Sequence, residues 1–225
     1  MTADQHAHSP QHQADDPVGL VLHNPIDYDI RTWLTTRGRE GKFRRTLVEL
    51  AGVKRGQAVL DVGCGTGSLA VAAAKVVGPA GSVVGIDPSP EMIGRAKSKA
   101  RRLGNVRFEM APAQNLPFPD ATFDVVTTSL VLHQLPPDAL HVAIPEMVRV
   151  LKPGGRMLLV DIGGDQGDRQ TVHVKRAAQH GAHLFDLREA APRLGEFGLK
   201  QLATGDVPFK LFHFERVQYV LAEKA

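Results

Sequence analysis

The amino-acid sequence predicts an α/β fold, namely a doubly wound, mostly parallel sheet with helices on both faces. Short apolar runs typical of buried strands alternate with amphipathic or alanine-rich stretches typical of helices. The first of these runs enters a loop with three alternating glycines, and a helical pattern follows at once. The second run ends on Asp87. Such alternation builds parallel sheets through right-handed crossovers, and ligands bind these sheets at the carboxyl ends of the strands.

The N-terminal part is predicted to be a disordered polar tail followed by a long helix. Residues 1–17 are mostly polar and carry three histidines without partners of fixed geometry, and they lack the pattern of a signal peptide. Residues 30–51 place apolar residues at helical spacing, and Gly52 ends the pattern. Residues 18–225 are expected to form one domain.

The centre of the chain alternates strands and helices. Residues 58–62 are a short apolar run, and residues 69–77 are rich in alanine and end at Gly78-Pro79. Similar patterns predict further strands at 82–86, 106–110 and 123–129 and helices at 89–103 and 138–151, the last with a kink at Pro145.

The C-terminal part is predicted to complete the sheet. A turn at Lys152-Pro153-Gly154-Gly155 precedes a strand over 156–162 and a loop at 163–167. Helical patterns follow at 169–185 and from Leu187, and two last strands are expected at 199–204 and 217–222.

Composition excludes several classes of protein. The single cysteine, Cys64, allows no intrachain disulfide and no cysteine zinc cluster, so a reducing cytoplasm is the expected location. The net charge is +3, and no aromatic residues interleave with the basic run at Lys97–Arg102, so a nucleic-acid surface is not expected. No segment is long and apolar enough for stable membrane insertion.

The glycine loop is the strongest local motif. The sequence Asp61-Val62-Gly63-Cys64-Gly65-Thr66-Gly67-Ser68 follows a buried strand and opens a helix, a context typical of nucleotide-binding folds. Dinucleotide folds use G-x-G-x-x-G, whereas this chain has G-x-G-x-G with Ser68 in place of the third glycine. The spacing therefore disfavours an NAD-linked oxidoreductase, which stays the alternative enzyme class.

Asp87 is the second candidate binding residue. It ends the second strand, and a carboxylate there accepts hydrogen bonds from both ribose hydroxyls of a nucleoside. The alternative is a cap for the next helix, but Ser89 already supplies that cap.

These motifs, together with Leu116-Pro117-Phe118 and Arg149-Val150-Leu151-Lys152-Pro153-Gly154-Gly155, appear in the order typical of one family. Over roughly residues 38–160 the chain resembles the class I S-adenosylmethionine-dependent methyltransferases, and most closely their ubiquinone, menaquinone and phospholipid methyltransferase subgroup. The resemblance implies a Rossmann-like methyltransferase fold with seven strands, the last antiparallel. It also implies that residues 163–198 help to form an acceptor pocket.

The resemblance implies cofactor roles for particular residues. Asp61 corresponds to the acidic residue under the methionine amino group, and Asp87 to the ribose ligand. The loop residues Gly63, Cys64 and Gly65 would contact the methionyl and ribosyl parts, and Pro88 and Met92 would cover adenine. Ser129 and Leu130 are expected to form the floor beneath the methyl group. Pro112 stands where the family usually has an aspartate for the adenine amine, so Ala113–Gln114 are the substitute candidates.

Two residues are candidates for catalysis. His133 follows the fourth strand near the expected methyl group and could act as a general base, or it could be structural. Tyr28 could close the cofactor pocket, or anchor the first helix to the core. Trp33 is expected in the core or the pocket lining.

The other histidines carry weaker hypotheses. His173 and His180 would share one helix face, with His183 close by, but no metal site is predicted from them. His213 is expected beside Phe209, Phe212 and Phe214 in an apolar wall or in the core.

The predicted function is methyl transfer from S-adenosylmethionine, with S-adenosylhomocysteine as product, to a small acceptor through oxygen, nitrogen, carbon or sulfur. An apolar or membrane-associated acceptor and a homodimer are both compatible with the sequence. A non-catalytic S-adenosylmethionine-binding protein stays open as the second alternative.

Overall fold

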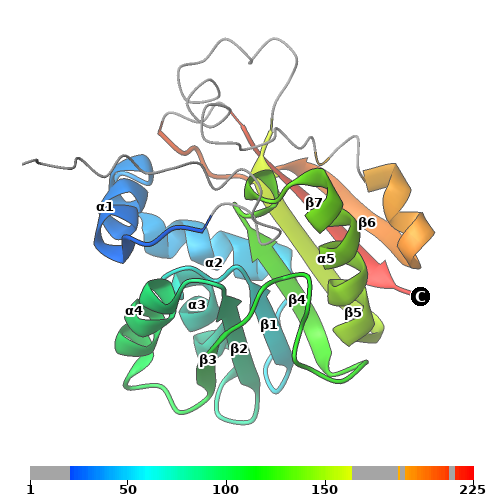
Figure 1. Ribbon diagram of the computed structural model, residues 1–225, viewed down its shortest axis with the longest axis horizontal. Coiled ribbons are helices and arrows are strands. Elements are labelled where there is room, and N and C mark those ends of the chain that lie inside the picture. The colour runs from blue at the N-terminus through cyan, green and yellow to red at the C-terminus, as the bar shows by residue number, and fades with distance from the viewer. Residues whose placement is uncertain (1–20, 164–186, 188–190, 213–215) are drawn as a thin grey trace, which may run out of the picture.

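The computed structural model describes residues 21–163, 187, 191–212 and 216–225. Seven strands form one sheet in the order β3-β2-β1-β4-β5-β7-β6 (Figure 1). They are β1 (Ala58–Val62), β2 (Ser82–Asp87), β3 (Val106–Met110), β4 (Phe123–Ser129), β5 (Leu151–Ile162), β6 (Leu199–Asp206) and β7 (Val217–Lys224). Strand β7 is antiparallel to both β5 and β6, and the other pairs are parallel. The predicted doubly wound sheet with an antiparallel last strand is confirmed.

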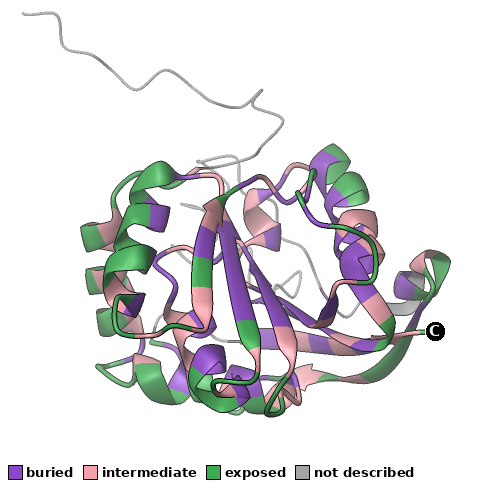
Figure 2. Cartoon of the chain, turned by 90° about the horizontal axis from the view of Figure 1, so that it is seen from below, coloured by how far each residue is buried: buried purple, intermediate pink, exposed green. Residues whose placement is uncertain are grey.

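Helices cover both faces of the sheet. One face carries α2 (Glu40–Leu50), α3 (Ser68–Val77) and α4 (Pro90–Ala100), and the other carries α5 (Pro137–Val150) and the 3₁₀ helix η3 (Ala191–Phe197). Strand residues alternate between the two cores, so Val59 packs with the first set and Leu60 with the second. Figure 2 shows the buried strands enclosed by helices whose outer surfaces are exposed. Within the described residues, no helix has the length and apolar character needed to cross a bilayer.

The prediction of a single helix over residues 30–51 is wrong. Helix α1 (Pro25–Thr35) and helix α2 are separate, and Arg37 and Gly38 between them have φ of +50° and +72°. The Arg37 N–H donates to Leu34 O at 3.0 Å and the Gly38 N–H to Trp33 O at 2.8 Å, the pattern of a Schellman helix end. This end lets α2 leave in a new direction and pack its apolar face on the sheet.

Helix α1 does not pack into the core, and the prediction for Trp33 is therefore wrong. The Trp33 side chain is 60% exposed, and no residue of α1 is buried. The sequence does mark where α1 begins, because Asn24 caps the helix through Asp27 N–H and Pro25 occupies its first turn.

A second correction concerns Lys152–Gly155. Strand β5 runs through these residues instead of starting after a turn. The pairing of β4 with β5 shifts register between Phe123 and Val125, which accommodates the extra residues as a bulge. The polar tail, the helical stretch over 169–185 and His173, His180, His183, His213 and Phe214 lie outside the described residues.

Candidate functional site

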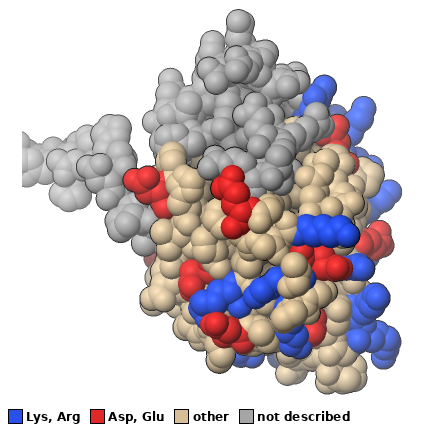
Figure 3. All heavy atoms as spheres, turned by 90° about the vertical axis from the view of Figure 1, so that its right-hand side faces the viewer, with Lys and Arg blue, Asp and Glu red and all other residues tan. Residues whose placement is uncertain are grey.

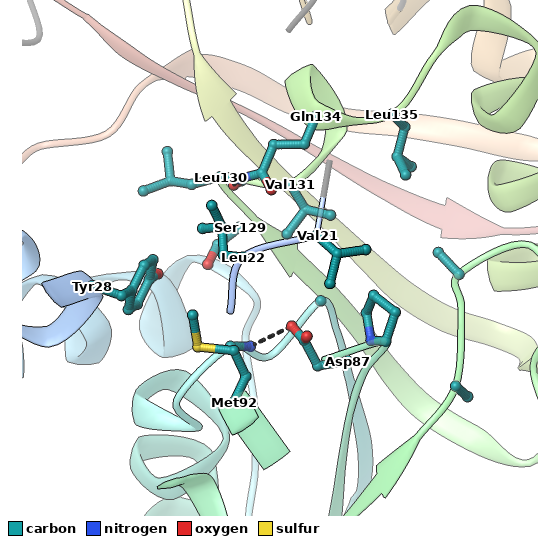
Figure 4. Close-up of a pocket in the computed structure, with 15 residues that line it drawn as sticks. Val21, Leu22, Tyr28, Asp87, Met92, Ser129, Leu130, Val131, Gln134 and Leu135 are labelled. Carbon is teal, nitrogen blue, oxygen red and sulfur yellow. Dashed lines mark hydrogen bonds between the residues drawn. The ribbon is translucent and has the colours of Figure 1, made fainter. Parts of the chain in front are cut away.

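The candidate site lies where the strand order reverses, between β1 and β4. Ligands bind doubly wound sheets at this switch point, outside the carboxyl ends of the strands. In Figure 4, Tyr28 enters the pocket from α1 on one side, and Leu135 lies on the opposite side. The lining residues are Val21, Leu22, Tyr28, Gly63, Gly65, Asp87, Pro88, Met92, Ala111, Ala113, Ser129, Leu130, Val131, Gln134 and Leu135. The structure thus brings most of the predicted cofactor residues to one pocket.

The three loop glycines have different structural roles. All have positive φ, which glycine adopts without the steric cost of a Cβ. Gly63 and Gly65 line the pocket, and a Cβ on Gly65 would lie 3.7 Å from the Tyr28 ring. A Cβ on Gly67 would lie 2.8 Å from both Ala96 and Phe108, so this glycine lets the loop pack against α4 and β3. The first two glycines therefore shape the pocket, and the third holds the loop in place.

Asp87 fixes the glycine loop from the end of β2. Its Oδ2 accepts a hydrogen bond from the Gly65 N–H at 2.9 Å (Figure 4), and its Oδ1 accepts one from the Ser89 N–H at 2.9 Å. Ser89 caps α4 by accepting from the Met92 N–H at 3.2 Å. Burial raises the pKa of Asp87, and the two N–H donors oppose that rise. Asp87 lines the pocket with its carboxylate already oriented, and its ribose role stays a prediction.

Asp61 is a buried carboxylate with an unsatisfied oxygen. It is 2% exposed, and the Thr127 hydroxyl donates to its Oδ1 at 3.0 Å. Its buried Oδ2 has no hydrogen-bond partner. Burial raises its pKa to about 7, although the Thr127 hydrogen bond and the positive charge of Arg44 act in the opposite direction. Such a carboxylate, behind the glycine loop, is suited to a cationic ligand group.

Arg44 is a functional candidate that the sequence analysis missed. It is 5% exposed on α2, its Nε lies 3.4 Å from Glu40 Oε1, and its Nη1 donates to Ser129 Oγ at 3.2 Å. The available signal was a charged residue on the apolar helix face that includes Phe43 and Leu47. A buried guanidinium that contacts the pocket-lining residue Ser129 can attract a ligand carboxylate.

His133 forms a pair with Asp161 at the end of β5. His133 Nδ1 lies 2.5 Å from Asp161 Oδ1, and the His133 backbone N–H donates to Asp161 Oδ2 at 2.9 Å. Burial lowers the pKa of His133, but the charge of Asp161 and its hydrogen bond outweigh this, and the pKa is raised. Because a carboxylate only accepts hydrogen bonds, Nδ1 carries the proton and Nε2 is left as the acceptor. His133 lies between the lining residues Val131 and Gln134 without lining the pocket itself.

The part of the pocket predicted to hold adenine is lined by apolar residues, but Gln114 is not among them. Pro88, Met92 and Ala113 line the pocket together with Ala111 and Leu135, whereas Gln114 does not. Cys64 also lies behind the lining, and its N–H is already used in a 2.8 Å hydrogen bond to Ile86 O. Burial raises the pKa of the Cys64 thiol well above its usual range, so the thiol is not a nucleophile.

A parallel sheet with a glycine-lined pocket at its switch point defines a class, the α/β proteins that hold a nucleoside-containing ligand. A family described as "Methyltransferase domain" matches residues 59–155. The ubiquinone/menaquinone biosynthesis C-methyltransferase UbiE of Cronobacter sakazakii is 37% identical over 192 residues, covering 84% of this chain and 72% of that protein. The protein of the same name from Citrobacter koseri is 37% identical over 153 residues, 66% of this chain and 60% of that protein.

The solved structures agree on the fold. A SAM-dependent methyltransferase from Aquifex aeolicus superposes with a TM-score of 0.69 at 24% identity, covering 91% of this chain and all of that one. The chain belongs to the class I S-adenosylmethionine-dependent methyltransferases, in the group that includes the UbiE enzymes. The predicted cofactor, S-adenosylmethionine, is confirmed by this membership.

Proposed function

We propose that this chain transfers the methyl group of S-adenosylmethionine to a small, apolar acceptor that carries a hydroxylated, electron-rich ring, with His133 as the general base. The observation that carries this proposal is the His133–Asp161 pair beside an apolar pocket wall. The match spans 60% of the length of the Citrobacter koseri relative, so the activity and the acceptor of this chain are inferred from its own residues.

The pocket residues fit the cofactor. The amino-acid end of S-adenosylmethionine carries an ammonium and a carboxylate, and the buried residues Asp61 and Arg44, behind the pocket lining, offer the opposite charges. Gly65 leaves pocket space that a Cβ would partly fill, and Gly63 lets the loop approach Val131, where a Cβ would clash with that side chain. When bound, the cofactor supplies a methyl group that its sulfonium has already activated for in-line displacement.

The protein then has two tasks, alignment and proton removal. Alignment of the reacting atoms within about 3–3.5 Å accounts for much of the acceleration in such displacements. His133 Nε2 accepts the proton of the acceptor hydroxyl, and Asp161 stabilises the imidazolium that results. Bound S-adenosylmethionine would supply the methyl group to the electron pair of the deprotonated ring and leave as S-adenosylhomocysteine. If a ring carbon takes the methyl group, that carbon would then lose its own hydrogen as a proton, and the ring oxygen would regain the proton that His133 holds.

The pocket wall indicates the character of the acceptor. Val21, Leu22, Leu130 and Val131 line the pocket, so the acceptor side is largely apolar. The named relatives are C-methyltransferases of ubiquinone and menaquinone biosynthesis, which supports a quinol-like ring. Loss of the hydroxyl proton makes the ring carbons of such a compound nucleophilic, which is why a base is useful for carbon methylation.

On the side of the molecule that Figure 3 shows, the surface charge favours a small-molecule acceptor over a nucleic acid. On the side formed by β6 and β7, cations and carboxylates intermingle (Figure 3). Within the basic run, Lys99 is already bound to Asp29 Oδ1 at 2.7 Å. Nucleic-acid surfaces instead concentrate unpaired cations on one face.

A screen of hydroquinones, catechols, phenols, amines and thiols for release of S-adenosylhomocysteine tests the proposal. We expect turnover with hydroxylated rings that depends on His133, and mass spectrometry will locate the new methyl group. Turnover confined to amines or thiols and unaffected by His133→Ala would contradict the assigned acceptor and base.

A further inference from the structure

Helix α1 presents its apolar face to solvent. Ile26, Ile30, Trp33 and Leu34 follow the spacing of a single helix face, and their side chains are 64%, 53%, 60% and 54% exposed. In the described part of the chain, five of the ten exposed large apolar side chains lie between Leu22 and Leu34. A surface helix normally buries such a face, so this orientation is inverted.

The inverted orientation is held by polar contacts of Asp29, which flanks the apolar face, and by Tyr28 on the inner face of α1. Asp29 accepts hydrogen bonds from Thr66 Oγ1 at 2.7 Å, Lys99 Nζ at 2.7 Å and Arg95 Nε at 2.9 Å. Tyr28 points into the pocket beside Gly65. The protein therefore positions the apolar face outward, at the edge of the molecule (Figure 1).

Several exposed cations lie within α1, the turn after it and the first turns of α2. Trp33 packs on the turn at Gly38, and a Cβ there would lie 3.2 Å from its Nε1. Arg31 is paired with Asp27 at 2.7 Å, and Arg37 and Arg39 lie over the rings of Phe212 and Phe209. Lys42 and Arg45 are also exposed, whereas Asp29 and Glu40 are partly buried, so the exposed charge of this segment is mainly positive. Tryptophan beside an aliphatic stripe with flanking cations is typical of helices that lie in the headgroup region of anionic bilayers.

We propose that the outer face of α1, formed by Ile26, Ile30, Trp33 and Leu34, docks the protein on the surface of a bilayer that contains anionic lipid. The helix lies in the interface and does not span it. The inner face of the same helix contributes Tyr28 to the pocket, and Val21 and Leu22, just before the helix, also line it. Docking therefore places one wall of the pocket next to the lipid phase, and this inference does not depend on the reaction proposed above.

The chain contains one tryptophan, so the intrinsic emission of Trp33 reports on α1 alone. We expect a blue shift and co-sedimentation with vesicles of phosphatidylcholine plus phosphatidylglycerol. Both should weaken with added salt and be much smaller with phosphatidylcholine alone, because the cations contribute through charge.

The variant I30E/L34E keeps Trp33 and removes the apolar face. This variant should bind anionic vesicles at least about tenfold more weakly, because two aliphatic side chains that would enter the bilayer become charged. The control V142E/L202E makes the same changes at exposed apolar positions on α5 and β6, and it should bind as the parent does. Circular dichroism checks that both variants are folded.

Three results would overturn the proposal. The first is absence of a spectral shift with anionic vesicles, and the second is equal binding by the parent and I30E/L34E. The third is a shift that grows with protein concentration in the absence of lipid, together with a dimer in analytical ultracentrifugation, because a second copy would then cover α1.

Discussion

The ion partner of His133 fixes which nitrogen of its imidazole is free. Asp161 holds Nδ1, so Nε2 is the ring nitrogen left to accept a proton. His133→Ala should lower kcat by about 10²–10⁴-fold, the usual range for a lost general base, and leave cofactor affinity nearly unchanged. Stopped assays of S-adenosylhomocysteine release, with calorimetry of cofactor binding, measure both quantities.

The pH dependence distinguishes a base from a structural residue. His133 must be neutral to accept a proton, and Asp161 raises its pKa, so kcat should fall on the acid side with a midpoint above 6.5. Asp161→Asn removes the charge and leaves burial, so the midpoint should move to lower pH and the plateau should drop. A midpoint that does not move in Asp161→Asn would assign the acid limb to another group.

Asp87 is predicted to determine cofactor affinity. Asp87→Ala removes a charge-assisted acceptor of the ribose, which costs about 1.5–3 kcal/mol, or about 12–150-fold in Kd. Glu109→Ala, at the end of the neighbouring strand β3 and outside the pocket, is the matched control and should bind normally. A folded Asp87→Ala protein with parental affinity would place the ribose elsewhere.

Asp61 links stability to pH. Its pKa is about 7 in the folded protein and near 3.8 when unfolded, so the folded state retains a proton that the unfolded state loses. This contribution is complete below about pH 4 and is lost as the pH rises toward 7. Asp61→Asn cannot titrate, so its free energy of unfolding should fall less between pH 5 and pH 8 than that of the parent.

Urea unfolding at the two pH values tests this prediction. Asp124→Asn is the control. Burial raises the pKa of Asp124, but its hydrogen bonds with Lys152 and Ala58 lower it further, so Asp124 stays ionised over this range. Its loss of stability should be the same at pH 5 and pH 8. Parallel pH profiles for Asp61→Asn and the parent would show that Asp61 does not titrate in this window.

Among the elements, the glycine loop gives the clearest stability prediction. Gly67→Ala forces a Cβ against Ala96 and Phe108 and puts alanine at φ +79°, so unfolding should become easier by about 2–4 kcal/mol. Gly104→Ala, which meets no atom within 4 Å, should change stability by less than about 1 kcal/mol. Equal stability of the two variants in urea would contradict the packing role of Gly67.

The elements also show how far the sequence could predict this fold. The strands 58–62, 106–110 and 123–129 are predicted to the residue, because turn residues bound each run. The first and third runs are mostly buried, whereas 106–110 is an edge strand in which only Phe108 is buried. The prediction of one helix over 30–51 is wrong, because the chain breaks where Arg37 adopts a positive φ. Position 37 is an arginine, so no glycine there signals this conformation. The apolar stripe of α1 misled the prediction for Trp33 because that stripe faces away from the core.

At the scale of the whole molecule, the site combines segments that only the folded topology brings together. The glycine loop and Asp87 are local motifs and were predictable. The pairing of His133 with Asp161 and the hydrogen bond from Arg44 to Ser129 join residues 28 and 85 positions apart, with no spacing pattern to reveal them. They follow from the adjacency of β4 and β5 and from the packing of α2 over the sheet.

The central claim is that this pocket is built for S-adenosylmethionine, and an equilibrium titration tests it most directly. Calorimetry of the full chain should give S-adenosylhomocysteine a Kd in the micromolar range, about −8 kcal/mol, and NAD a Kd at least about a hundredfold weaker. The same titration with Asp87→Ala checks that the measured site is this pocket. Binding of NAD as tight as or tighter than that of S-adenosylhomocysteine would contradict the account.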